Sequence, residues 1–157
     1  MFTDPFGLCP RCATIGWTFG YPVTITLANN QTWDKVSPNV RTNIDVAARL
    51  SFVGSVGISW TTGGTHDAAS RHYPDAQGGI GKAADIYSLN GSEITAADHT
   101  GVVATFQAAL NVTPGARENF GPARIDKLGK PYCTSGSPEC KKLIEDHKDH
   151  IHYSVNK

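Results

Sequence analysis

The sequence has no surplus of charge and no long apolar run. Its 157 residues carry 14 Lys and Arg against 14 Asp and Glu, and its pI is about 7.0. Proteins that neutralise phosphates usually carry a basic surplus, so this balance disfavours nucleic-acid binding. A transmembrane helix needs about 18 consecutive apolar residues and a secretory signal needs a basic and then an apolar segment, and we find neither. We therefore expect no nucleic acid and no membrane as partner.

The size and composition predict one folded domain. An apolar fraction of 39% in 157 residues suffices for one hydrophobic core with a pocket in it. The 16 Gly and 9 Pro favour a loop-rich α+β fold over a helical bundle.

Hydrophobic periodicity predicts alternating strands and helices. A helix is expected from Pro38 to about Phe52, and a second one from a capping-box-like start at Thr95 and Asp98 to Leu110. The other predicted elements are strands at 23–27, 56–60, 83–89, 116–120 and 150–155 and a short helix at 139–147. The fold class expected from this order is an α+β domain with a small antiparallel sheet flanked by helices.

Three segments that contain His or Asp suggest a metal site. His150 and His152 alternate in the last predicted strand, so both imidazoles should leave one face of it. Asp85 lies in a strand between small apolar neighbours, where a carboxylate is costly to bury unless a cation meets it. His72 lies in a glycine-rich loop before that strand. Two imidazoles and one carboxylate from separate elements are a ligand set of catalytic zinc, with a fourth position left for water.

A hydrolytic zinc site also needs a general base within hydrogen-bond reach of the water. Asp149, three residues before His152, is the nearest carboxylate in the sequence that meets this need. It is our candidate for the base.

The motifs around these residues resemble those of the LAS zinc peptidases. That family includes D-Ala-D-Ala carboxypeptidases and dipeptidases, phage L-alanyl-D-glutamate endolysins and the hedgehog signalling domain. Its motifs S-x-H, G-x-A-x-D and D/E-x-x-H look like Ser70-x-His72, Gly81-x-Ala83-x-Asp85 and Asp149-x-x-His152. The resemblance spans roughly residues 17–155.

The resemblance implies a hedgehog-like or D,D-peptidase-like fold and a role for each site residue. His72, Asp85 and His152 would be the zinc ligands, and Asp149 would be the catalytic acid and base. His150 would help to stabilise the tetrahedral intermediate.

The sequence departs from the family pattern in two places. Twelve residues separate His72 from Asp85, which requires an insertion of about six residues around 73–80, made sterically easy by two glycines. In the family an Arg that binds the substrate usually precedes the first His, but residues 61–64 of this sequence contain no Arg. Arg71 and Arg41 are the candidate replacements. His66 is a competing first ligand, although only His72 has the S-x-H context.

The first eight residues carry a second resemblance. Asp4-Pro5-Phe6-Gly7-Leu8 is similar to the closing signature of Rhs-repeat shells, after which a variable C-terminal toxin begins. It implies a leader at 1–8 and a toxin domain at 9–157, with the Rhs shell as a partner in the precursor. An ordinary turn is the alternative interpretation.

The four cysteines leave several states open. Cys9 and Cys12 form one pair in the sequence and Cys133 and Cys140 another, compatible with a structural zinc site, disulfides or reduced thiols. We favour a Cys133–Cys140 disulfide, which would suit an oxidising periplasm.

Together the two resemblances imply a zinc-dependent peptidoglycan peptidase that acts as a secreted antibacterial effector in the periplasm of a target bacterium. Its substrate would be the stem peptide, and its producer would need an immunity protein. The alternatives are a metal-dependent nuclease toxin, because Rhs shells often carry nucleases, and a non-catalytic hedgehog-like zinc-binding module. Neutral charge counts against the nuclease, and Asp149 in the base position favours catalysis.

Overall fold

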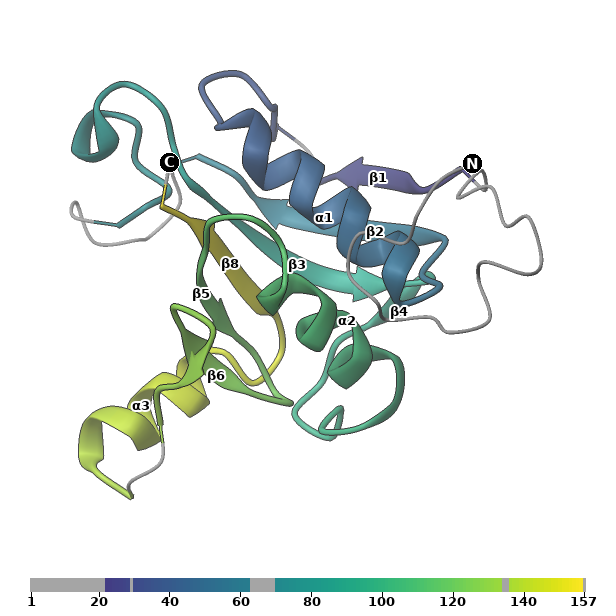
Figure 1. Ribbon diagram of the computed structural model, residues 1–157, viewed down its shortest axis with the longest axis vertical. Helices are drawn as coiled ribbons and strands as arrows, with labels where there is room; N and C mark the ends of the chain where they lie inside the picture. The colour runs from purple at the N-terminus through teal and green to yellow at the C-terminus, as the bar shows by residue number, and fades with distance from the viewer. Residues whose placement is uncertain (1–21, 29, 63–69, 134–135, 157) are drawn as a thin grey trace.

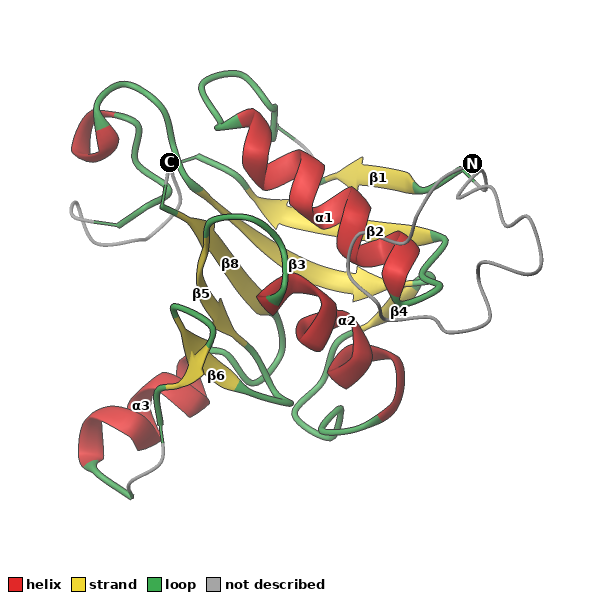
Figure 2. Cartoon of the chain, in the orientation of Figure 1, coloured by secondary structure: helices red, strands yellow, loops and turns green. Residues whose placement is uncertain are grey.

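The computed structural model describes residues 22–28, 30–62, 70–133 and 136–156. In this part of the chain three α-helices and an eight-stranded mixed sheet form an α+β domain (Figures 1 and 2), which confirms the predicted class. The expected leader at 1–8 lies outside the described residues, as do Cys9, Cys12 and His66.

The sheet places the C-terminal strand at its centre. The strands follow one another in the order β1-β2-β3-β8-β5-β6-β7, and β4 pairs with β3. Their bounds are β1 Thr24–Leu27, β2 Ser55–Trp60, β3 Ala83–Leu89, β4 Ser92–Glu93, β5 Ala116–Phe120, β6 Ile125–Lys127, β7 Lys130–Pro131 and β8 Ile151–Val155. Strand β8 therefore has β3 on one side and β5 on the other.

The expectation of a small antiparallel sheet is wrong in one respect, because β1 pairs with β2 in parallel. The chain between these strands contains helix α1 (Pro38–Leu50). Such a helical crossover brings the chain back to the end of the sheet at which β1 began, so that β2 runs in the same direction as β1. The remaining strand pairs are antiparallel. The sheet is thus mixed, and it is larger than the sequence suggested.

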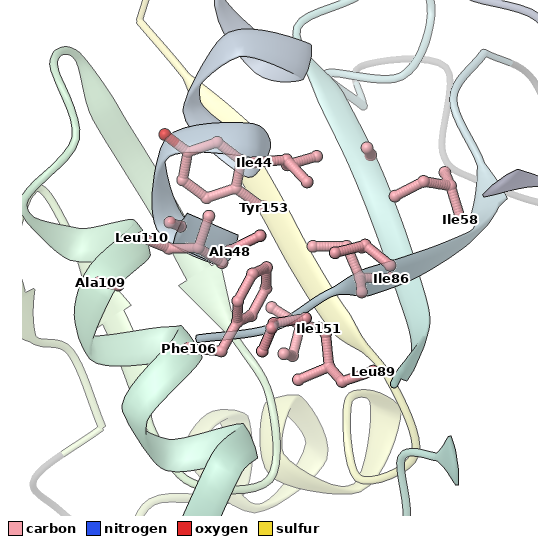
Figure 3. Close-up of a cluster of buried hydrophobic side chains, with 14 of the residues drawn as sticks. Ile44, Ala48, Ile58, Ile86, Leu89, Phe106, Ala109, Leu110, Ile151 and Tyr153 are labelled. Atoms are coloured by element: carbon pink, nitrogen blue, oxygen red, sulfur yellow. The ribbon is translucent and has the colours of Figure 1, made fainter. Parts of the chain in front are cut away.

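Helix α1 covers one face of the sheet (Figure 1). It begins at Pro38, after Ser37, where the fixed φ of proline suits the first helical turn. Its buried apolar residues recur at helical spacing and enter the main core. Figure 3 shows this core, where α1 and α2 meet the central strands through Ile44, Ala48, Phe106, Leu110, Ile86, Ile151 and Tyr153.

Helix α2 (Gly101–Asn111) packs beside α1, but it does not start at the expected capping box. The carboxylate of Asp98 accepts hydrogen bonds from the backbone N–H and the hydroxyl of Thr95, and these bonds close a separate turn. Thr100 then has an extended backbone, and the helix begins at Gly101. The Asp98 carboxylate closes this turn and so does not cap the helix that begins three residues later, which is why the pattern misplaced this boundary.

Helix α3 (Pro138–Asp146) lies away from α1 and α2 (Figure 1). The hydroxyl of Ser137 accepts a hydrogen bond from the backbone N–H of Cys140 and caps the helix. The predicted disulfide between Cys133 and Cys140 is confirmed, with the two Cα atoms 5.3 Å apart. Among the described helices, none is both long and apolar enough to cross a bilayer.

The two faces of β8 have different characters. Ile151, Tyr153 and Val155 lie in the core beneath α1 and α2, as their alternation predicted. The residues between them, His152 and Ser154, therefore belong to the opposite face, on which the candidate site is built.

Candidate metal centre

Strand register and one loop bring together the three predicted metal ligands. Asp85 on β3 lies directly opposite His152 on β8, and His72 arrives from the loop before β3. His152 Nδ1 is 2.9 Å from Asp85 Oδ1, and His72 Nε2 is 3.2 Å from both of these atoms. All three side chains are buried, and together they can hold a metal ion.

Local hydrogen bonds set the orientation of His72. Its backbone N–H donates to the hydroxyl of Ser70, 3.3 Å away. Its Nδ1 donates to the backbone carbonyl of Thr61 at 3.0 Å, because a carbonyl can only accept. The lone pair of Nε2 in the neutral ring therefore faces Asp85 and His152.

Gly81 allows the His72 loop to lie against the start of β3. A Cβ atom at position 81 would be 2.8 Å from the backbone carbonyl oxygen of His72, closer than real Cβ contacts. The neighbouring backbone is fixed by hydrogen bonds, in which Lys82 N–H donates to Arg71 O and Ser37 N–H donates to Gly81 O. Packing therefore requires glycine at position 81.

Residues 73–80, where the resemblance implies an insertion, form a turn-rich segment between His72 and β3. A short 3-10 helix covers Asp75–Gln77, and Gly78 and Gly79 follow with φ values of 76° and 93°. Only glycine adopts these conformations without strain, as the sequence suggested. With this segment between them, His72 Nε2 still lies 3.2 Å from Asp85 Oδ1.

The donor set fits a metal ion. For a tetrahedral ion with bonds near 2.0 Å, ligand atoms lie about 3.3 Å apart, close to the 2.9–3.2 Å found here. The arrangement directs the lone pair of His72 Nε2 towards the carboxylate of Asp85, and only a proton or a cation can stabilise two acceptors in this position. The carbonyl behind His72 is the partner that metal-bound imidazoles usually have.

The charge around His152 is set by two carboxylates. Burial disfavours the imidazolium, but Asp85 on one ring nitrogen and Glu118 near the other outweigh it and raise the pKa of His152 to about 9. Metal-free protein at neutral pH therefore holds a proton at this ring, and a metal ion must displace that proton to bind.

Glu118 on β5 is the carboxylate near the outer nitrogen of His152. Its Oε2 lies 3.6 Å from His152 Nε2 and accepts a hydrogen bond of 2.6 Å from the hydroxyl of Ser154. Burial would raise the pKa of Glu118, but the contacts with His152 and Ser154 lower it to about 2. A carboxylate behind a histidine holds the ring so that its other nitrogen faces the metal.

Aromatic rings pack around His152. Phe120 on β5 stacks on it with centroids 5.9 Å apart, and His147, just after α3, meets both rings edge-on. His147 Nδ1 donates to the carbonyl of Leu143, and burial lowers the pKa of His147 to about 4, so its ring is neutral at pH 7. These two rings cover part of the His152 ring.

The two predicted catalytic residues lie just before β8. The strand begins at Ile151, one residue later than expected, so His150 precedes it. His150 Nδ1 donates to the exposed carboxylate of Asp149 at 2.9 Å, and this bond lowers the pKa of Asp149. The ring of His150 packs on His147, which contacts His152, so Asp149 is joined to the cluster through two rings.

The structure places neither candidate for the missing substrate Arg in the metal cluster. The guanidinium of Arg71 donates to the carbonyl of Val155 and to Gln77, and so ties the loop to the end of β8. Arg41 lies on α1, which covers the other face, and stacks on Trp33.

Three further residues that no sequence pattern predicted contact His152, namely Glu118, His147 and Phe120. The contacts of Glu118 and Phe120 with His152 depend on β5 being the neighbour of β8, and no local pattern in the sequence reveals that strand order. The position of His147 after α3 was visible, but its packing against His152 was not.

No family model, no curated protein and no solved structure matches the chain.

Proposed function

We propose that the domain is a zinc-dependent peptidase that hydrolyses a peptide bond in the stem peptide of peptidoglycan. The observation that carries this proposal is the convergence of His72 Nε2, His152 Nδ1 and Asp85 Oδ1 in a buried group. Catalytic zinc sites use three protein ligands of this kind. As part of the same proposal, the domain has a hedgehog-like or D,D-peptidase-like fold.

The chain's own residues hold and orient the metal. His72, Asp85 and His152 bind it, while the Thr61 carbonyl and the Glu118 carboxylate fix the two imidazoles from behind. Zinc in such a site supplies a Lewis acid and makes water nucleophilic at neutral pH.

Asp149 is the proton acceptor in this proposal. Its lowered pKa keeps the carboxylate ionised at neutral pH, as a general base requires. The hydrogen bond from His150 holds that carboxylate in one orientation. The role of His150 with the tetrahedral intermediate rests on the family resemblance.

The proposed setting is the periplasm of a target bacterium, reached as an Rhs effector, with an immunity protein in the producer. The Cys133–Cys140 disulfide supports an oxidising compartment. The Rhs-like leader supports delivery by another cell.

The test is digestion of purified peptidoglycan sacculi, with released fragments identified by mass spectrometry. The zinc-loaded domain should release peptide-bond products, and His152→Ala should release none. Asp149→Asn should retain zinc but cut about 100-fold more slowly or worse, the usual contribution of a general base. Asp146→Asn is the matched control, because Asp146 is a neighbouring exposed carboxylate that pairs with Lys142 on α3.

Intact sacculi in the presence of confirmed zinc would overturn the proposal. Degradation of DNA or RNA under the same conditions would then favour the nuclease. Full activity of Asp149→Asn would remove Asp149 from the mechanism.

A further inference from the structure

Two rows of side chains extend from the metal centre across the sheet on the same face. Strand register pairs His152 on β8 with Phe120 on β5, and Phe120 with Ile125 on β6. Two residues along each strand, Ser154 pairs with Glu118, and Glu118 pairs with Lys127. Because alternate residues share a face, both rows lie on the side opposite α1 and α2.

The second row ends in positive charge. Glu118 Oε1 lies 3.5 Å from Arg117 Nε and 3.8 Å from Lys127 Nζ. The other oxygen of Glu118 faces His152 and Ser154, so one carboxylate is shared among two cations and the metal-binding histidine. Both cationic side chains remain about one-third exposed, which leaves them accessible to an anion.

The first row supplies an aromatic surface beside that charge. Tyr132, just after β7, stacks on Phe120 with centroids 6.3 Å apart, and Phe120 stacks on His152. Lys127 Nζ lies 5.0 Å from the centre of the Tyr132 ring. Tyr132 is 54% exposed, so the exposed part of its side chain and the Lys127 ammonium form one accessible edge.

We infer that Lys127, supported by Arg117, binds a carboxylate of the peptide substrate, while Tyr132 supports the chain between that carboxylate and the metal centre. The inference rests on the proposed peptidase function and names its substrate contact. The contacts through Glu118 place Lys127 Nζ within roughly 10 Å of the outer nitrogen of His152. A metal held by the other nitrogen, Nδ1, would lie about 4 Å farther, so about four extended residues cover the whole span. The carboxylate that Lys127 binds therefore lies no more than about four residues from the cleaved bond.

The test uses three synthetic stem peptides that differ only in charge. One has a free C-terminus and a free acidic residue, the second is amidated at the C-terminus, and the third is amidated at the acidic residue. We measure kcat/KM for the zinc-loaded wild type, for Lys127→Met and for Lys130→Met. Lys130 is the matched control, because it is the exposed cross-strand partner of Lys127 and lies one strand farther from the centre.

The wild type should lose about ten- to hundredfold in kcat/KM with one of the two amides, the usual value of a charged hydrogen bond. Lys127→Met should cut the free peptide as slowly as that amide and show no preference between them, whereas Lys130→Met should keep the wild-type preference. The amide that weakens wild-type cleavage identifies which carboxylate is bound.

Three results would overturn this inference and leave the proposed function intact. The wild type could cleave all three peptides with equal kcat/KM, or Lys127→Met could lose kcat/KM equally on all three. Alternatively, Lys130→Met could lose the preference for the free peptide over the amide. If the wild type cleaves neither these peptides nor sacculi, the proposed function fails and this inference fails with it.

Discussion

Replacing Gly81 by Ala tests how the fold delivers His72 to the metal centre. The added Cβ would lie 2.8 Å from the backbone carbonyl oxygen of His72 and 3.2 Å from the side chain of Thr62. The side chain can turn away, but the carbonyl can move only if the whole His72 loop moves. The substitution therefore acts on a metal ligand through the backbone.

The expected cost follows from overpacking. Insertion of a methyl group into a packed site costs about 1–3 kcal/mol. In a domain of this size each kcal/mol lowers Tm by about 2–4 °C, so we expect Tm to fall by about 2–12 °C. Displacement of His72 should also weaken zinc binding by about tenfold or more, as changes around metal ligands do.

Thermal melts with and without zinc, together with zinc titrations, measure both effects. Gly136→Ala is the control, because a Cβ at Gly136 meets no atom within 4 Å. If Gly81→Ala melts and binds zinc as Gly136→Ala does, the close approach of the loop to β3 is wrong.

Three further predictions concern the surroundings of the site. Glu118→Gln should weaken zinc binding about 10- to 100-fold in titrations, because His152 loses the carboxylate behind it, and unchanged affinity would contradict this role. In chelator, Tm should fall as pH rises from about 6.5 to 9: the raised pKa of His152 gives stability that is complete below 6.5 and is lost through 9. Zinc affinity should rise over the same pH range. If neither Tm nor zinc affinity changes with pH, His152 carries no proton in the metal-free protein. Tyr153→Phe should lower the free energy of unfolding by about 1–3 kcal/mol in urea melts, because the buried Asn43 and Thr113 lose their shared hydroxyl partner.

The sequence predicted that His72, Asp85 and His152 come together, because the signals of these residues are local. Asp85 stands out as a charge within an apolar strand, and β3 was predicted with its observed bounds, Ala83–Leu89. His72 stands out through Ser70 and the glycine-rich loop, and alternation separated His152 from its core neighbours. The structure brings these three residues together, as expected.

The sequence did not predict the strand order or the residues that depend on it. Glu118 reads locally as one charge in a polar strand, and it meets His152 only because β5 lies beside β8. The start of α2 was misplaced because the Asp98 carboxylate can close a turn as well as cap a helix. Such choices are decided by tertiary packing rather than by local propensity.

The most direct test of the central claim is a zinc titration of the metal-free domain. One zinc should bind per chain, and His72→Ala, Asp85→Ala and His152→Ala should each lose more affinity than the 10- to 100-fold expected for a residue behind a ligand. His150→Ala is the control, because His150 is only two residues from His152 but lies outside the group of three ligands. One zinc in the wild type and in His150→Ala, with binding lost in the three ligand variants, is the result we predict. Absence of zinc binding by the wild type, or undiminished binding by any of the three ligand variants, would contradict the account.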